Sequence, residues 1–159
     1  MSEQTQLLTN DTDDALRLDK QVCFALYAAS NLLTGLYRPL LAELGLTFPQ
    51  YLVMLVLWEK SPQSVGSLGQ QLYLDSGTLT PLLKRMESAG LVKRQRDASD
   101  ERRVLVELTE QGDSLRASAH QVANTLASGP LLPMTEAEAL RDGARKLIGV
   151  LTSEQKAEE

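Results

Sequence analysis

One cysteine in this sequence has a tyrosine at helical spacing, a pairing that could support redox chemistry. Tyr27 follows Cys23 by four residues, so on a helix its hydroxyl could donate a hydrogen bond to a thiolate sulfur. The apolar neighbours Val22 and Phe24 equally suit a small buried hydrophobe, which is what a free cysteine most often is. The expected helix cap lies about nine residues upstream of Cys23, beyond the reach of the helix dipole. Hydroxyl donors would therefore have to provide most of the stabilisation of a thiolate.

Basic side chains gather in a second region, residues 84–103. This window holds seven basic and four acidic residues, a local charge of +3, whereas the chain carries −5 and the remainder therefore −8. Such a cluster is often only a solvated surface, so the elements that carry it decide whether it can contact nucleic acid. The seven basic residues are Lys84, Arg85, Lys93, Arg94, Arg96, Arg102 and Arg103.

The elements expected before this window are helical. Asp13 or Asp14 can cap a long first helix, and Pro39 is expected to kink or break it. Thr47 opens the next helix. Because residues 51–58 are apolar on every side, that helix is expected to be fully buried.

The basic window begins in the second of two short helices. The first is expected at about residues 65–72 and the second at about 76–89, with Asp75 as its N-cap and Gly90 as its stop. Alternating apolar residues predict a β-hairpin over about 91–108.

Two further helices are expected after the hairpin. Thr109 begins one, which residues 128–133 should end. The spacing of Thr135 and Glu138 is that of a capping box and predicts the start of the final helix.

Two short helices followed by a basic hairpin are typical of a winged helix-turn-helix. Small hydroxyl residues at the start of the second helix can approach base edges, and basic residues further along suit phosphate contacts. The hairpin arginines suit a groove or the DNA backbone. The candidate DNA-binding residues are Ser76, Thr78, Thr80, Lys84, Arg85, Arg94, Arg96, Arg102 and Arg103.

Several segments resemble MarR-type repressors. The stretch Leu72-Tyr-Leu-Asp-Ser-Gly-Thr-Leu-Thr-Pro81 is similar to the start of their recognition helix, and Asp100-Glu-Arg102 with Leu108-Thr-Glu-Gln-Gly112 is similar to their wing signature. Residues 22–28 and 49–52 further resemble the OhrR branch, which senses organic hydroperoxides. The resemblance covers roughly residues 14–150. It implies a single, mainly α domain with a small β-hairpin. Dimerisation helices at about 13–46 and 110–152 would flank a winged helix-turn-helix at about 47–109.

The resemblance also implies a homodimer on a pseudo-palindromic operator, with Arg102 in the minor groove, and marks Tyr37 as a sensing residue. Tyr37 lies fourteen positions after Cys23, about 21 Å along a continuous helix, so the two cannot touch within one helix. Contact requires a sharp fold-back or an antiparallel partner helix, and the implied dimer supplies the latter. Better-known relatives have a tyrosine where this chain has Phe48, so one hydroxyl donor is missing.

Composition narrows the classes of protein. A chain of 159 residues, 43% hydrophobic, suits one domain with a real core. Cys23 and His120 are the only cysteine and histidine, which argues against a disulfide framework or a Cys/His zinc site, and no metal or cofactor is expected. The polar N-terminus is unlike a signal peptide and no apolar run could span a membrane, so a soluble cytoplasmic protein is expected.

These observations predict a DNA-binding repressor, not an enzyme, that releases its operator when an organic hydroperoxide oxidises Cys23. Without a second cysteine, the sulfenic acid must react with a small thiol or oxidise further. Two alternatives stay open: a MarR-type repressor gated by a small phenolic or aromatic ligand, with Cys23 structural, and a one-cysteine thiol peroxidase.

Overall fold

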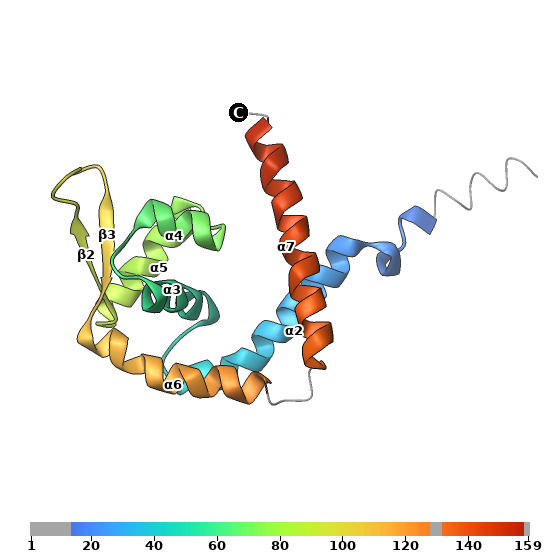
Figure 1. Cartoon of the computed structure of the whole chain (residues 1–159), viewed down its shortest axis with the longest axis horizontal. Helices are drawn as coiled ribbons and strands as arrows, with labels where there is room; N and C mark the ends of the chain where they lie inside the picture. The colour runs from blue at the N-terminus through green and yellow to red at the C-terminus, as the bar shows by residue number, and fades with distance from the viewer. Residues whose placement is uncertain (1–13, 128–131, 158–159) are drawn as a thin grey trace, which may run out of the picture. The chain divides into compact units, whose positions relative to one another are not determined.

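The computed structural model describes residues 14–127 and 132–157 of the chain (Figure 1). The described residues fall into two units, one reaching Val122 and the other beginning at Ala123. The expected mainly helical fold with a small sheet is confirmed, whereas the candidate cap Asp13 and residues 128–131 of the expected break lie outside the described residues. The elements in chain order are η1 (Leu18–Lys20), α2 (Val22–Ala42), α3 (Phe48–Glu59), β1 (Gln63–Ser64), α4 (Val65–Leu72), α5 (Ser76–Ser88), β2 (Val92–Arg96), β3 (Val104–Leu108), α6 (Glu110–Ala127) and α7 (Met134–Ala157).

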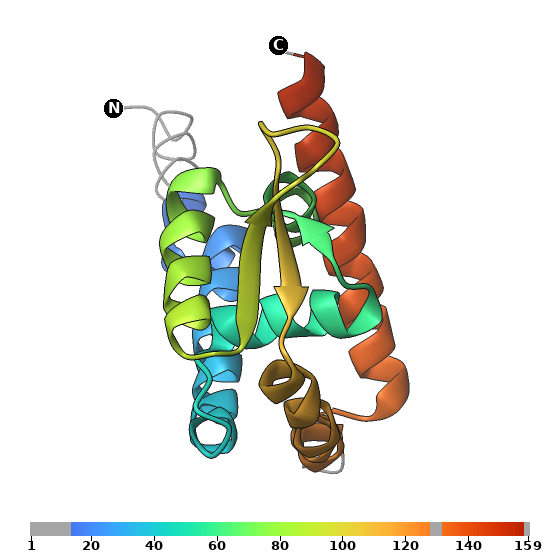
Figure 2. The same ribbon diagram turned by 90° about the vertical axis from the view of Figure 1, so that its left-hand side faces the viewer.

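The predicted hairpin is formed by β2 and β3, which pair antiparallel. β1 adds a third strand on the other side of β3, giving the order β1-β3-β2 (Figure 2). The sequence did not predict β1, because a strand of two residues has no alternation to detect. The core of this unit lies between the sheet and the four helices α2, α3, α4 and α5. Its largest fully buried side chains are Leu41, Val53, Met54, Leu57, Leu68, Leu79, Leu83, Met86, Val92 and Val106.

The first long helix does not start at Asp14, and that prediction is wrong. Arg17 has extended backbone immediately before η1, and the extended backbone of Gln21 separates η1 from α2. The Gln21 side-chain amide donates hydrogen bonds to the carbonyls of Ala15 and Arg17, at 2.6 and 3.1 Å, and so stabilises the break. As a result, α2 begins only at Val22.

Pro39 does not break α2, which continues through it to Ala42. A proline lacks the N–H that would bond the carbonyl of Gly35, but Gly35 is exposed and water can replace that donor. Two residues beyond the proline, Leu41 is fully buried and holds the last turn against the core. Tertiary packing therefore outweighs the local preference.

Thr47 opens α3 as predicted, and the structure adds a capping box there. The Thr47 side chain accepts the N–H of Gln50, and the Gln50 side chain accepts the N–H of Thr47 at 2.9 Å. The expectation of complete burial over residues 51–58 is wrong, because Leu55 is 37% exposed in the single chain.

The helix-turn-helix consists of α4 and α5, whose bounds agree with the prediction to within one residue. Ser64 caps α4 by accepting the N–H of Ser67 at 3.1 Å. Asp75 is the predicted cap of α5, and Gly90 ends the turn after it with a φ of 75°. The turn between the helices contains Tyr73 in the left-handed region, at φ 55° and ψ 39°.

Three backbone segments meet where β3 leads into α6. The Thr109 hydroxyl donates to the carbonyl of Gly90 at 2.6 Å and accepts the N–H of Gly112 at 3.0 Å, so Thr109 starts α6 as predicted. The Trp58 indole N–H donates to the carbonyl of Gly112 at 3.1 Å. This junction ties α3, the end of α5 and the start of α6 together.

α7 begins at Met134, so the predicted capping role of Thr135 is wrong. The carbonyl of Pro133 accepts the N–H groups of Glu136 and Ala137, both at 3.0 Å, and the fixed φ of proline already suits a helix start. None of the helices in the described ranges combines the length and apolarity needed to cross a membrane.

Candidate nucleic-acid interface and thiol site

The start of α5 presents small hydroxyl side chains to solvent. Ser76 and Thr78 are exposed, and Thr80 is half-buried. One carboxylate oxygen of Asp75 accepts the backbone N–H of Thr78 at 2.9 Å and the other accepts its hydroxyl at 3.0 Å. The N–H of Thr78 holds the pKa of Asp75 below its usual value. The cap therefore also fixes the Thr78 side chain at the end of the helix from which base edges can be reached.

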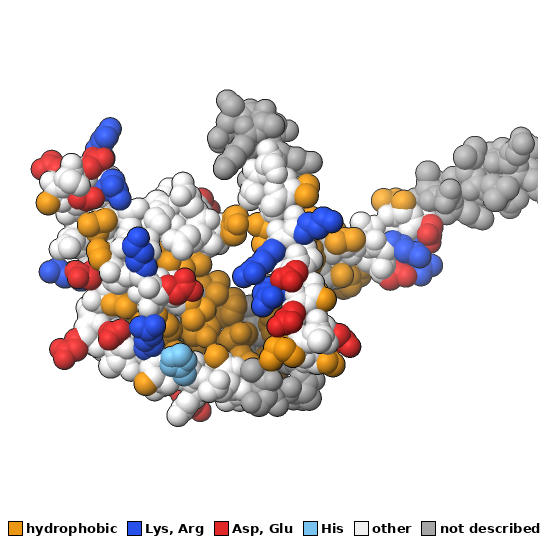
Figure 3. All heavy atoms as spheres, viewed as in Figure 1, with side chains coloured by type: hydrophobic (Ala, Val, Ile, Leu, Met, Phe, Trp, Pro, Cys, Tyr) orange, Lys and Arg blue, Asp and Glu red, His pale blue; other side chains and the backbone are white. Residues whose placement is uncertain are grey.

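The wing consists of β2, β3 and the turn between them, residues 92–108. Aspartates orient two arginines of this turn, and acidic and basic side chains lie together over the wing (Figure 3). Arg102 Nε lies 3.1 Å from Oδ1 of Asp100, and Arg103 Nη1 lies 3.6 Å from Oδ2 of Asp97. The hydrogen bond from Arg102 holds the pKa of Asp100 below its usual value. The Arg102 side chain nevertheless stays 91% exposed, so the pair directs the guanidinium without hiding it.

The other predicted basic residues differ in whether their side chains have a hydrogen-bond or ion-pair partner. Arg96 Nη1 donates to the carbonyl of Glu101 at 3.1 Å. Lys84, Arg85 and Lys93 are exposed, and within the described part of the chain none of the three forms an ion pair. Lys84 and Arg85 on α5 therefore suit phosphate contacts, as the sequence predicts.

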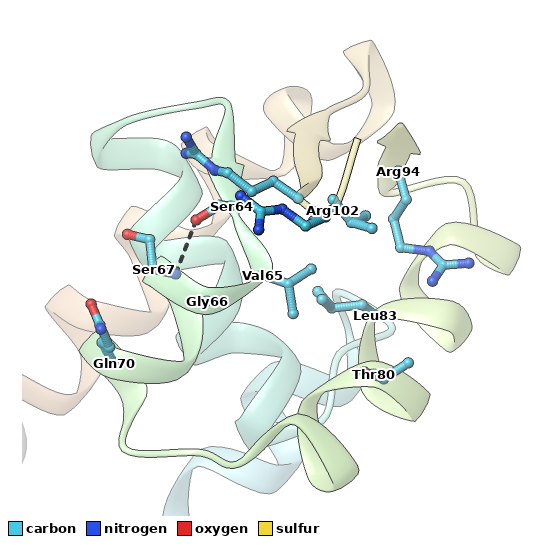
Figure 4. A pocket seen from close by; sticks show the side chains of 11 residues that line it. Ser64, Val65, Gly66, Ser67, Gln70, Thr80, Leu83, Arg94 and Arg102 are labelled. Carbon is cyan, nitrogen blue, oxygen red and sulfur yellow. Dashed lines mark hydrogen bonds between the residues drawn. The ribbon is translucent and has the colours of Figure 1, made fainter. Parts of the chain in front are cut away.

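A pocket of about 570 Å³ brings part of the predicted interface together (Figure 4). The pocket is lined by Thr80 of α5, Arg94 of β2, and Arg102 and Arg103 of the wing turn. Other predicted residues lie outside its lining, namely Ser76, Thr78, Lys84, Arg85 and Arg96. Sequence reasoning missed the polar residues that α4 and its cap contribute, Ser64, Ser67 and Gln70, although a serine before a helix is a recognisable cap.

Cys23 is exposed and is the second residue of α2. The expectation that the cap lies nine residues upstream is wrong, because α2 starts at Val22. Gln21 makes no side-chain cap hydrogen bond, and the N–H of Ala25 is the first to bond back, to the carbonyl of Gln21 at 3.2 Å. The amides of residues 22–24 therefore have no intrahelical acceptor, so free N–H donors lie in the same turn as Cys23.

Two further features of the surroundings of Cys23 are the charges before it and the tyrosine after it. Arg17 donates hydrogen bonds at 3.0 Å to both carboxylate oxygens of Asp19, which offsets the negative charge four residues before Cys23. The same contact lowers the pKa of Asp19. Tyr27 is 67% exposed one turn beyond Cys23, and no hydrogen bond joins these two side chains among those described.

The other sensing candidates lie in an aromatic cluster between α2 and α3. The ring of Tyr37 is 5.0 Å from that of Phe48 and 5.8 Å from that of Tyr51. Burial raises the pKa values of Tyr37 and Tyr51, so both hydroxyls stay protonated donors. Sequence reasoning treated Tyr51 only as part of a buried helix. Since α2 is continuous, Tyr37 is about 21 Å along it from Cys23, and one chain does not assemble the site.

Large apolar side chains remain exposed on the helices outside the winged region. In the first unit, α2 exposes Val22, Phe24, Leu26, Leu32, Leu33 and Leu36. In the second unit, α7 exposes Met134, Leu140, Ile148, Val150 and Leu151. Surfaces of this kind usually mark contacts with another chain.

Comparison with known proteins agrees with this geometry. The family described as "Transcriptional regulator SarA/Rot" matches residues 35–118. The organic hydroperoxide resistance transcriptional regulator of Bacillus subtilis is 51% identical over 113 residues, which are 71% of this chain and 77% of the relative. The transcriptional regulator TtmR of Methylorubrum extorquens is 48% identical over 130 residues, which are 82% of this chain and 67% of the relative. These relatives are transcriptional regulators and not enzymes.

The fold also matches a solved regulator. AbfR of Staphylococcus epidermidis, in its reduced form and bound to DNA, superposes with a TM-score of 0.74 at 35% identity. The match covers 89% of this chain and 99% of AbfR. The winged helix-turn-helix predicted from the sequence is thereby confirmed.

Proposed function

The chain belongs to the MarR/SarA family of transcriptional regulators, and from this premise we propose that it is a repressor that senses organic hydroperoxides through Cys23. The reduced protein binds a pseudo-palindromic operator as a homodimer, and oxidation of Cys23 releases it. The observation that carries the proposal is the position of Cys23, exposed in the first turn of α2 beside amides without intrahelical acceptors. The similarity to a hydroperoxide resistance regulator supports it.

The winged helix-turn-helix supplies the DNA contacts. Ser76, Thr78 and Thr80 face the bases in the major groove, and Lys84 and Arg85 contact phosphates. The wing carries Arg102 toward the minor groove, where the narrow groove attracts a guanidinium. In support, Arg102 is both oriented by Asp100 and exposed.

The dimer completes the thiol site. The exposed apolar faces of α2 and α7 support association of two chains, for which the dimerisation segments are about 13–46 and 110–152. An antiparallel partner helix would bring Tyr37 and Phe48 of one chain to Cys23 of the other, with Tyr27 one turn away. Because Phe48 has no hydroxyl, Tyr37 and the helix amides stabilise the thiolate.

The redox step is a transfer of one oxygen atom. The thiolate attacks the terminal peroxide oxygen, the O–O bond breaks, an S–O bond forms and the alkoxide leaves as an alcohol after taking up a proton. Sulfur loses two electrons and the peroxide gains them. Because the chain has no second cysteine, a small external thiol then attacks the sulfenic acid, forming a mixed disulfide and water, or further peroxide oxidises the sulfur.

A DNA-binding assay on wild type and one matched variant tests the sensor. Binding to a duplex from upstream of the chain's own coding sequence is measured by fluorescence anisotropy, with and without cumene hydroperoxide. Wild type should release DNA on oxidation, whereas Cys23→Ser should bind equally well and not release. Release from Cys23→Ser would refute the proposed sensor, and identical release of both proteins by a phenolic ligand would favour a ligand-gated regulator.

Mixed dimers test whether the site is shared. Cys23→Ser and Tyr37→Phe are mixed and allowed to exchange subunits, and the oxidation kinetics of the remaining thiols are followed. In a shared site, the heterodimer pairs an intact Cys23 with the intact Tyr37 of the other chain, so about half of the thiols should react at the wild-type rate. A site within one chain would give no fast fraction.

A further inference from the structure

The side chain of Glu87 joins the end of the recognition helix α5 to the wing strand β2. Its Oε1 accepts the backbone N–H of Arg94 at 2.9 Å. Its Oε2 accepts the Nε–H of Arg94 at 2.9 Å and lies 2.8 Å from Nη2. The two side chains are only 35% and 25% exposed, so water competes weakly for these contacts.

The contact occupies the free edge of β2. In the order β1-β3-β2, this strand has a neighbour on one side only, and the N–H of Arg94 is bonded to Glu87. This N–H is also the main reason that the pKa of Glu87 lies below its usual value. The carboxylate therefore holds both the backbone and the side chain of the strand against α5.

The guanidinium of Arg94 is therefore held by Glu87. This changes the role expected for Arg94, which was to contact a groove or the DNA backbone. It lines the same pocket as Thr80, Arg102 and Arg103, so it lies within the proposed interface (Figure 4). Glu87 balances its charge there. Lys84 and Arg85 on the same helix form no ion pair within the described residues and keep their full charge.

We propose that Glu87 is a specificity-determining residue: it fixes the wing relative to α5 and keeps Arg94 off the phosphate backbone. The inference rests on the proposed function, in which this face binds DNA. Specific binding requires α5 and the wing to reach their grooves together, and so benefits from a fixed geometry. Non-specific binding depends on the number of cations that reach phosphates, and so is weakened when Arg94 is held. Loss of Glu87 should therefore act in opposite directions on the two kinds of DNA.

The test compares Glu87→Gln with Glu101→Gln by anisotropy, on the operator duplex and on a scrambled duplex of equal length and composition, at several salt concentrations. Both variants remove one negative charge from the winged helix-turn-helix, but among the described residues no hydrogen bond or ion pair joins the Glu101 side chain to Arg94. Glu87→Gln should bind the scrambled duplex more tightly, with a salt dependence steeper by about 0.9 in log K per log salt. Its preference for the operator should fall by about tenfold or more. Glu101→Gln should tighten both duplexes alike and keep the preference.

A third variant separates the two parts of the proposal. Arg94→Gln breaks the same contact without releasing a cation, so operator binding should weaken while scrambled binding does not tighten. It also decides the question if Glu87→Gln does not fold, which circular dichroism would show. The inference is overturned if the variants that break the contact keep the wild-type operator preference, or if Glu87→Gln weakens both duplexes in equal proportion. Wild type that fails to prefer the operator would instead refute the proposed function.

Discussion

Replacing Thr109 by valine should destabilise the protein measurably, because its hydroxyl connects three segments of backbone. The oxygen accepts the N–H of Gly112 at 3.0 Å as the cap of α6, and the hydrogen is directed at the carbonyl of Gly90 at 2.6 Å, with that of Leu91 at 3.1 Å. Valine keeps the branched shape and removes only these contacts. Loss of the cap costs about 0.5–2 kcal/mol, and loss of the second hydrogen bond costs about 0.5–1.5 kcal/mol.

The expected loss for Thr109→Val is therefore about 1–3 kcal/mol in the free energy of unfolding. The backbone bonds from Thr109 N–H to Leu91 and from Asp113 N–H to Thr109 remain, at 3.1 and 2.9 Å, so the junction keeps its path. Urea unfolding followed by circular dichroism measures the effect, at equal chain concentrations because the stability of the proposed dimer would depend on concentration. Thr109→Ser keeps the hydroxyl and should lie within about 0.5 kcal/mol of wild type. If valine proves as stable as serine, the hydroxyl does not hold the junction.

Four further outcomes are expected. Tyr73→Gly should raise stability by up to about 1 kcal/mol in urea unfolding, because Tyr73 is left-handed and 64% exposed; a loss would show that its ring packs. Gly112→Ala should lower stability by about 3 kcal/mol or more in the same assay, because its Cβ would overlap the carbonyl of Leu91. Phe48→Tyr should speed peroxide oxidation of Cys23 below neutral pH by up to about tenfold in stopped-flow kinetics, and an unchanged rate would place the hydroxyl away from sulfur. The pKa of Asp75 is lowered from 3.8, so its contribution is complete above about pH 3.8 and disappears as the pH falls through the lower folded value; Asp75→Asn, which still caps, should flatten that part of the stability curve.

Much of the fold could be predicted because its signals are local. Thr47 with Gln50, and Asp75 with Thr78, bond across three residues, and such spacing is visible in a sequence. Gly90 ends a helix because it lacks a Cβ and tolerates a positive φ. The alternation in the hairpin and the helices on either side of Asp75 were therefore recognisable, and so was the winged helix-turn-helix with its basic face.

Other features depend on contacts that spacing does not reveal. Residues near Cys23 have good helical periodicity, yet bonds from Gln21 to Ala15 and Arg17 move the start of α2 to within two residues of the thiol. Pro39 is accepted inside α2 because Leu41 is buried against the core.

The sequence by itself determined the kinds of chemistry, a lone thiol and a basic DNA-reading unit, since these follow from residue type and local pattern. Only the tertiary structure decided which groups act together. It paired Arg94 with Glu87 and bonded Trp58 to Gly112, fifty-four residues along the chain. The physical reason is that a helix cap is chosen by neighbours in sequence, whereas the direction of a side chain between elements is chosen by the packing of all of them.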